Sequence, residues 1–275
     1  ALSSAASDVY KRQDYKNMFR LDGRTTVVTG GCGYLGKEIV KGLCAFGANV
    51  YVVDYKINEI AELNCDEYAG RIHYIECDLN DTQAIKDTLK EAAGVQGVIH
   101  NLITMAANLG AGVVTDVETM DDECWKKGIE GTIGYTFRTV REVIPYMKKC
   151  SDGSIVNIGS LYAAGAPDPR TYFDTPFNST PNYGAGKAAT VEFTKYCASY
   201  LAKYGIRANS VSPGSFPHEK VQENQLFKDR LAYKTMLGRI GYPEDLVGAM
   251  VYLLSSASKY VTGINVMVDG GQTAW

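Results

Sequence analysis

The sequence contains few of the residues that build metal centres and histidine-dependent active sites. Its 275 residues include three histidines, His73, His100 and His218. The seven cysteines are scattered, with no CxxC pair and no Cys/His cluster at zinc-ligand spacing. We therefore predict no metal site and no histidine-based catalytic triad. The odd, scattered thiols indicate reduced cysteines, and hence a cytoplasmic protein.

Long apolar runs and a strong excess of one charge are also absent. No stretch of about 18 apolar residues occurs, so we expect no membrane-spanning segment. The formal net charge is only −3, which argues against a binding surface for nucleic acid or for an anionic membrane. We expect a small-molecule substrate instead.

The first residues differ in character from the rest. Residues 1–13 are rich in Ser and Ala and lack the apolar core of a secretory signal. Residues 7–13 look like translated linker rather than native sequence. We expect residues 1–19 to be disordered and non-native, and residues 20–275 to form a single domain. With 45% hydrophobic residues, that length suffices for one substantial core.

A glycine cluster follows the first β-branched run, residues 25–29, and leads into apolar residues at helical spacing. Strand, tight turn and helix in this order form the context of a dinucleotide-binding loop, where glycine lets the backbone approach a pyrophosphate. The alternative is a glycine-rich turn that binds nothing. The candidate cofactor contacts here are Thr29, Gly30, Gly33, Tyr34, Leu35 and Gly36.

Two acidic residues end the next two expected strands. Asp54 lies 18 residues after Gly36. A carboxylate there accepts hydrogen bonds from ribose hydroxyls and repels a 2′-phosphate, which favours NAD over NADP, although Lys56 is nearby. Asp78, followed by Leu79, is placed to reach an adenine. It could equally be a plain helix cap.

Tyr183 and Lys187 are four residues apart, and therefore lie on one face of a helix. A free tyrosine has a pKa near 10, and bringing it to about 7 takes roughly 4 kcal/mol. An adjacent ammonium favours the phenolate. The pair thus suits acid–base chemistry on an alcohol or carbonyl, with Ser160 upstream. Such a pair also occurs by chance on exposed helices.

The chain alternates strand-like and helical segments, which predicts an α/β fold. We expect one Rossmann-like, doubly wound parallel sheet of about seven strands, with helices on both faces and the ligand at the carboxyl ends of the strands. The expected strands are 25–29, 49–53, 71–76, 97–101, 153–159, 206–211 and 264–268, and the longest expected helices are 121–149 and 182–204.

These motifs, in this order, resemble the short-chain dehydrogenase/reductase family. The likeness rests on TGGCGYLG, the CDL at 77–79, IVNIGS ending at Ser160, YGAGK, the IRANSVSPG segment and the closing VTGINVMVDGG. The stretch 166–183 and the C-terminal half look most similar to oxidoreductases associated with flagellin glycan modification.

The resemblance implies a role for each matching residue. Tyr183 would exchange the proton with the substrate oxygen, Lys187 would hold the nicotinamide ribose, and Ser160 would orient the substrate oxygen. Asn101, in the His100–Ile103 segment that replaces the family's NNAG motif, would contact the cofactor. Relatives form homodimers and homotetramers through the long helices, so we expect a homo-oligomer. Further cofactor contacts implied in the same way are Pro213 and Gly214.

Three departures from the family pattern stand out. The glycine spacing is TGxxGxxG, as in the larger sugar-nucleotide-modifying branch. The asparagine of the family's proton relay is replaced by Gly131 or Thr132. Between Ser160 and Tyr183 lies an insertion, residues 163–182, that carries four of the eight prolines.

The insertion is a candidate wall of the substrate pocket, and we expect Arg170 or Tyr172 to contact a polar substrate. A subunit contact is the alternative. Residues 215–236, which include Phe216 as a further candidate contact, are expected to form a lid, or else a static pair of helices.

We therefore expect an NAD-dependent oxidoreductase that interconverts a secondary alcohol and a ketone in a sugar- or polyol-like molecule. Two alternatives remain open. One is a sugar-nucleotide epimerase or dehydratase, as the glycine spacing suggests. The other is a non-catalytic protein that senses NAD, as the missing asparagine allows.

Overall fold

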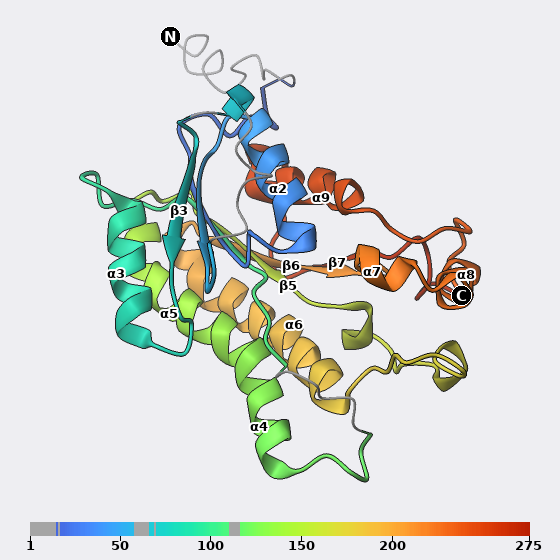
Figure 1. The fold of residues 1–275 in the computed structure, drawn as a ribbon. Helices are drawn as coiled ribbons and strands as arrows, with labels where there is room; N and C mark the ends of the chain where they lie inside the picture. Colours follow the sequence, from blue (N-terminus) through green and yellow to red (C-terminus); the bar gives the residue numbers. More distant parts are fainter. Residues whose placement is uncertain (1–14, 16, 58–65, 69, 110–115) are drawn as a thin grey trace, which may run out of the picture.

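The computed structural model describes residues 15, 17–57, 66–68, 70–109 and 116–275. These residues form a seven-stranded parallel sheet with the order β3-β2-β1-β4-β5-β6-β7, which confirms the predicted doubly wound architecture (Figure 1). The strand order reverses between β1 and β4, where such folds bind their ligands. The strands are β1 (Thr25–Thr29), β2 (Asn49–Asp54), β3 (Ile72–Glu76), β4 (Asn101–Thr104), β5 (Ser154–Ile158), β6 (Arg207–Pro213) and β7 (Asn265–Val268).

Helices cover both faces of the sheet (Figure 1). On one face lie α2 (Tyr34–Ala45) and α9 (Val247–Leu254), and on the other lie α3 (Thr82–Ala93), α5 (Tyr135–Met147) and α6 (Pro181–Leu201). The remaining α-helices are α4 (Asp122–Ile129), α7 (Glu219–Gln222) and α8 (Gln225–Tyr233). The short helical segments are η2 (Asp66–Tyr68), η3 (Glu130–Gly134), η4 (Leu161–Ala163), η5 (Pro169–Thr171), η6 (Ala202–Tyr204), η7 (Pro243–Leu246) and η8 (Ser256–Ser258).

The period of two along each strand divides the apolar residues between two cores. Val27 belongs to the core beneath α3 and α5, whereas its neighbour Val28 belongs to the core beneath α2 and α9. Both side chains are fully buried. Because both faces of a parallel sheet are covered, its central strands need apolar residues at consecutive positions, as β1 has.

Six of the seven expected strands agree with the structure within two residues, but β4 is displaced. It runs from Asn101 to Thr104 rather than over residues 97–101. Its register pairs Asn101 with Thr26 and Thr104 with Thr29. The apolar residues on both sides of Asn101 allowed either reading, and pairing with β1 selects the later one.

The expected helix 121–149 is interrupted by the π-helical segment η3. There the Gly131 carbonyl accepts a hydrogen bond from the backbone N–H of Asn108 at 2.9 Å. A Cβ added at Gly131 would lie 1.7 Å from the Asn108 carbonyl oxygen. The glycine therefore permits a close approach between this helix and the segment after β4.

The ordered domain begins earlier than the predicted residue 20. The carbonyl of Met18 accepts hydrogen bonds from the Ala257 N–H at 3.0 Å and from the Ser256 hydroxyl at 2.9 Å. Disorder up to residue 19 is thus wrong for residues 17–19. The rest of the segment, apart from Tyr15, lies outside the described residues. Within the described residues no helix combines the length and apolar character needed to cross a membrane.

The insertion 163–182 packs against α8 through a third, smaller apolar cluster. Phe227 and Leu231 of α8 are buried in it, with Tyr172 and Phe177 of the insertion packed against them. The yellow insertion and the orange α8 accordingly lie together, away from the sheet (Figure 1). The segment expected to be a lid is therefore joined to the insertion by apolar contacts.

Substituting Gly131→Ala should destabilise the protein by about 2 to 4 kcal/mol, because the new methyl group meets rigid backbone rather than a movable side chain. Urea unfolding measures the change. Gly248→Ala is the matched control: Gly248 also lies in a helix, but nothing lies within 4 Å of its added Cβ. The free energy of unfolding of that variant should rise by up to about 1 kcal/mol. Equal stability of the two variants would contradict the proposed close contact.

Candidate active site

A cavity of about 610 Å³ opens at the carboxyl ends of the strands nearest the point where the strand order reverses. Seven of the predicted cofactor contacts line it together, which the sequence order alone could not show. They are Gly30, Gly33, Tyr34, Leu35, Asp54, Asp78 and Leu79.

The glycine loop has the geometry that a bound pyrophosphate needs. Gly30 has φ +74, and an added Cβ would lie 2.7 Å from the backbone of Ala106. An added Cβ at Gly36 would lie 2.5 Å from the Gly30 carbonyl oxygen. No side chain caps the N-terminus of α2 at Gly33, and its first turn has no acidic residue. Its N–H groups and positive dipole end can therefore receive an anion.

Two neighbouring contacts hold this loop and its surroundings in place. The Thr29 hydroxyl accepts a hydrogen bond from the Met105 N–H at 3.3 Å. The Asp54 carboxylate accepts one from the Cys32 N–H of the glycine loop at 3.1 Å, and one from the Tyr55 N–H at 2.8 Å. Asp54 therefore both orients the loop and presents its charge to the cavity, as expected for a residue that binds ribose hydroxyls.

Asp78 does not cap α3, the role that was the alternative to a cofactor contact. The cap of α3 is Asp81, which accepts hydrogen bonds from the N–H groups of Gln83 and Ala84. Asp78 instead accepts from the N–H of Asn80 at 2.9 Å and lines the cavity.

The prediction that Asn101 contacts the cofactor is wrong. Asn101 starts β4, at the opposite end from the cavity, and is fully buried with its amide donating to the Thr26 hydroxyl at 3.2 Å. The displaced strand explains the error. The residues that follow the true end of β4, which sequence reasoning missed, line the cavity instead. They are Met105, Ala106, Ala107 and Asn108.

The three predicted catalytic residues come together at the end of β5. Ser160 follows this strand and is 6% exposed. Tyr183 lies in the first turn of α6 and is hydrogen-bonded with Ser160. Lys187, one helical turn later, is buried and donates from Nζ to the Ile158 carbonyl at 2.8 Å. Its Nζ lies 5.9 Å from the centre of the Tyr183 ring.

Burial dominates the electrostatics of this group. It raises the pKa of Tyr183, while the hydrogen bond with Ser160 acts in the lowering direction. Burial also lowers the pKa of Lys187 from 10.5 to about 8. The expected lowering of the Tyr183 pKa by Lys187 is therefore not observed. The physical reason is that burial of the Tyr183 hydroxyl disfavours its charged form more than the hydrogen bond with Ser160 favours it.

The predicted substrate contacts lie in different surroundings. The Tyr172 hydroxyl is hydrogen-bonded to that of Tyr162, whose ring meets the Tyr183 ring edge-on. Arg170 points to solvent and pairs with Asp168 at 2.9 Å, so it does not join this group.

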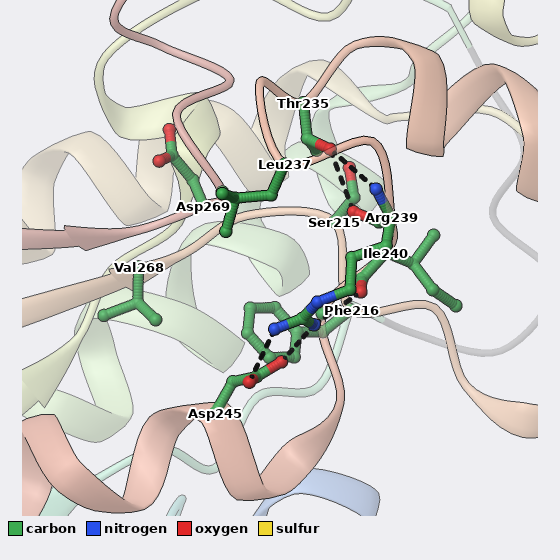
Figure 2. Close-up of a pocket in the computed structure, with 11 residues that line it drawn as sticks. Ser215, Phe216, Thr235, Leu237, Arg239, Ile240, Asp245, Val268 and Asp269 are labelled. Atoms are coloured by element: carbon green, nitrogen blue, oxygen red, sulfur yellow. Dashed lines mark hydrogen bonds and ion pairs between the residues drawn. The ribbon is translucent and has the colours of Figure 1, made fainter.

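Phe216 also lies outside the catalytic group. Figure 2 shows it in a separate cavity of about 190 Å³ beside the Arg239–Asp245 ion pair. Neither Ser160 nor Tyr183 lines that cavity.

The contacts of Tyr34, Pro213 and Gly214 complete the predicted set. The Tyr34 hydroxyl accepts a hydrogen bond from Gln222 of α7 at 3.0 Å, which connects the glycine loop to the expected lid. Pro213 ends β6 at the same edge of the sheet. Gly214 is required there, because an added Cβ would lie 2.5 Å from the backbone of Asp269.

Comparison with known proteins decides the family. Residues 34–273 match the family model described as enoyl-(acyl carrier protein) reductase. The chain belongs to the short-chain dehydrogenase/reductase family, whose members are NAD(P)-dependent oxidoreductases. Among the described residues of this short-chain dehydrogenase/reductase, no group of three or more His, Cys, Asp or Glu side chains could hold a metal ion.

Several individual members align with nearly the whole chain. Galactitol 2-dehydrogenase (L-tagatose-forming) of Cereibacter sphaeroides is 29% identical, over 95% of this chain and 100% of its own length. Sorbose reductase of Schizosaccharomyces pombe is 30% identical, over 93% and 98%. A short-chain dehydrogenase from Leptospira borgpetersenii, solved with bound NAD+, superimposes with a TM-score of 0.81 at 32% identity, covering 92% and 94%.

Replacing the buried ammonium with a methionine should stabilise this short-chain dehydrogenase/reductase near neutral pH. The folded pKa of Lys187 is about 8, below its ordinary 10.5. The unfolded chain thus binds more protons between these values, and wild-type stability rises with pH in that window. At pH 7, removing the buried charge in Lys187→Met should raise the free energy of unfolding by about 2 to 3 kcal/mol. Loss of the hydrogen bond to the Ile158 carbonyl should lower it by about 1 kcal/mol.

That gain should shrink towards zero as the pH approaches about 10.5. Urea unfolding at several pH values measures it. The matched control is Lys126→Met, since the Lys126 side chain is 66% exposed and should show no comparable pH dependence. A gain that does not change with pH would contradict the desolvation of Lys187.

Proposed function

We propose that this protein is an NAD-dependent oxidoreductase that interconverts a secondary alcohol and a ketone in a polyol- or sugar-like molecule. The observation that carries the proposal is the grouping of Ser160, Tyr183 and buried Lys187 at the end of β5, beside the strand ends that line the glycine-loop cavity. A proton-transferring phenol next to a nucleotide cavity suits carbonyl reduction and alcohol oxidation.

The residues present fit a dinucleotide. The uncapped N-terminus of α2 would hold the pyrophosphate, and Asp54 would hold the adenosine ribose. When bound, the nicotinamide supplies or accepts the hydride.

The chain's own groups handle the proton. Ser160 would bind and orient the substrate oxygen, and Tyr183 would exchange a proton with it. Because burial raises the pKa of Tyr183, its hydroxyl stays protonated at neutral pH, which suits donation to a forming alkoxide. Lys187 would hold the nicotinamide ribose and favour the phenolate in the reverse direction.

The choice of NAD over NADP rests on Asp54. Its carboxylate lines the cavity and would repel a 2′-phosphate.

The substrate class rests on two supports. Relatives that align over 98% or more of their own length carry the names galactitol 2-dehydrogenase and sorbose reductase. The wall beside Tyr183 presents the phenol groups of Tyr162 and Tyr172, which suit a polar substrate. A closer kinship with flagellin-modifying oxidoreductases is part of the proposal, and its support is the sequence of the insertion and the C-terminal half.

We also propose a cytoplasmic homo-oligomer. Aromatic residues on α5 and α6 remain accessible in the single chain, with Phe137 44%, Tyr196 66% and Tyr200 44% exposed. A second copy of the chain would cover this apolar surface.

A sugar-nucleotide epimerase or dehydratase is less well supported. The TGxxGxxG spacing favours it, but the chain aligns over the full length of galactitol 2-dehydrogenase, an oxidoreductase by name. A non-catalytic NAD sensor would have no use for the grouped Ser160, Tyr183 and Lys187.

Tyr183→Phe should lower kcat by at least about 10³-fold while leaving the Kd for NADH nearly unchanged, because only the proton-transferring hydroxyl is lost. Nicotinamide fluorescence measures binding, and absorbance measures turnover of a polyol panel. Tyr260→Phe is the control, since Tyr260 is fully exposed. Full activity in the Tyr183 variant would refute the proposed function.

Asp54→Ser should reduce the preference for NAD over NADP by about tenfold or more, because the repelling charge is removed while a hydroxyl remains for the ribose. The ratio of kcat/KM values for the two cofactors measures this effect. An unchanged ratio would contradict the assignment of Asp54.

A further inference from the structure

Tyr162, just before the insertion, brings a second phenol to Tyr183, and Tyr172 of the insertion bonds to it. The hydroxyl groups of Tyr162 and Tyr172 are hydrogen-bonded to each other. The Tyr162 ring meets the Tyr183 ring edge-on, with centroids 6.5 Å apart and an interplanar angle of 82°. A chain of three aromatic rings therefore runs from the catalytic hydroxyl into the insertion.

The hydrogen bond between Tyr162 and Tyr172 leaves unused hydrogen-bonding capacity on both hydroxyl groups. A phenol offers one O–H donor and two lone pairs, and one shared hydrogen bond uses a single donor of the two. The pair can therefore donate and accept further hydrogen bonds.

A third hydroxyl lies beside Tyr172. Tyr172 and Ser179 both line a cavity of about 460 Å³ in the insertion, and Tyr162 is not among the residues that line it. The buried Ser179 hydroxyl lies close enough to the Tyr172 hydroxyl to act on its pKa in the lowering direction. The three hydroxyls therefore form one chain, and a ligand hydroxyl can use the hydrogen-bonding capacity that this chain leaves open.

The rest of the cavity wall is mostly apolar, with Asn178 as a further polar residue. Proline and phenylalanine side chains supply most of it, including Phe177, which packs against Phe227 with ring centroids 4.8 Å apart. The Tyr172 ring also packs against the Phe227 ring, with centroids 5.6 Å apart. A few hydroxyls on an apolar wall are the composition of a site that recognises a small polar molecule.

The insertion is fixed in place by charge as well as by packing. Asp168 accepts a hydrogen bond from Lys234, at the end of α8, at 2.7 Å. The hydrogen bonds from Arg170 and Lys234 hold the pKa of Asp168 well below its usual range, so its charge persists at neutral pH. The hydroxyl groups are thus held by a supported segment.

We propose that Tyr162, Tyr172 and Ser179 form a subsite for a second hydroxyl of the substrate, close to the carbon that is oxidised or reduced. The inference rests on the proposed function and narrows its substrate to a diol, polyol or sugar rather than a simple alcohol. A site built to hydrogen-bond a hydroxyl rejects analogues that lack it, because its own groups are then left unpaired.

The test uses two pairs of alcohols that differ by one hydroxyl: 2,3-butanediol against 2-butanol, and 1,2-cyclohexanediol against cyclohexanol, each with NAD. The wild-type protein should prefer the diol of at least one pair by tenfold or more in kcat/KM. Tyr172→Phe and Tyr162→Phe should each erase about tenfold of that preference and leave the simple alcohols within about threefold.

Phenylalanine keeps the ring packing, and Tyr233→Phe is the matched control. Tyr233 is 86% exposed on α8, so its variant should behave as wild type. Thermal unfolding shows whether each variant remains folded.

Two results would overturn the inference. One is a wild type that turns over both members of each pair equally well. The other is an equal loss on diol and simple alcohol in the Tyr172 and Tyr162 variants, which is the signature of a merely structural pair. Failure of the proposed function looks different: the wild type oxidises none of the four alcohols nor any of the polyol panel, and the inference falls with it.

Discussion

The buried ammonium of Lys187 is the interaction on which the site depends. The ammonium lies buried where β5 ends, and its removal from water costs free energy. Its hydrogen bond to the Ile158 carbonyl offsets part of this desolvation cost. A charge held in a poorly hydrated place acts more strongly on its neighbours than it would in water. The protein therefore gives up stability near neutral pH to keep a cation beside a phenol.

The glycines of the cofactor region act through contacts rather than through flexibility alone. Gly30 and Gly36 allow the loop to pack against Ala106 and against itself. Gly131 likewise allows a close contact, between its π-helical segment and the backbone of Asn108. Asn108 also lines the cavity at the glycine loop. The position where the family carries an asparagine thus has a structural role here, and Thr132 beside it donates to the Gly128 carbonyl at 2.8 Å.

The insertion and α8 form an apolar cluster outside the sheet. Their apolar cluster around Phe227 is separate from the two cores that flank the sheet. Because Tyr172 belongs to this cluster and also bonds to Tyr162, the packing of the insertion is coupled to the substrate side of Tyr183.

Local patterns were sufficient for much of this protein. Alternating β-branched runs and glycine turns predicted the parallel sheet, because such signals depend on residues close together in the chain. The motif spacing singled out Ser160, Tyr183 and Lys187, which the fold brings together, and Asp54, which lines the cavity. The prediction that Asn101 contacts the cofactor was wrong because the end of β4 is set by its register with β1. That register is a long-range hydrogen-bonding pattern, which no local run of residues specifies.

The same limit applies to Arg170 and Tyr172. Their sequence neighbourhood is shared, yet one turns to Asp168 and the solvent while the other reaches Tyr162. The direction of each side chain, the partner of each hydroxyl and the burial of Lys187 arise from contacts between distant segments. Only the folded chain brings those segments together.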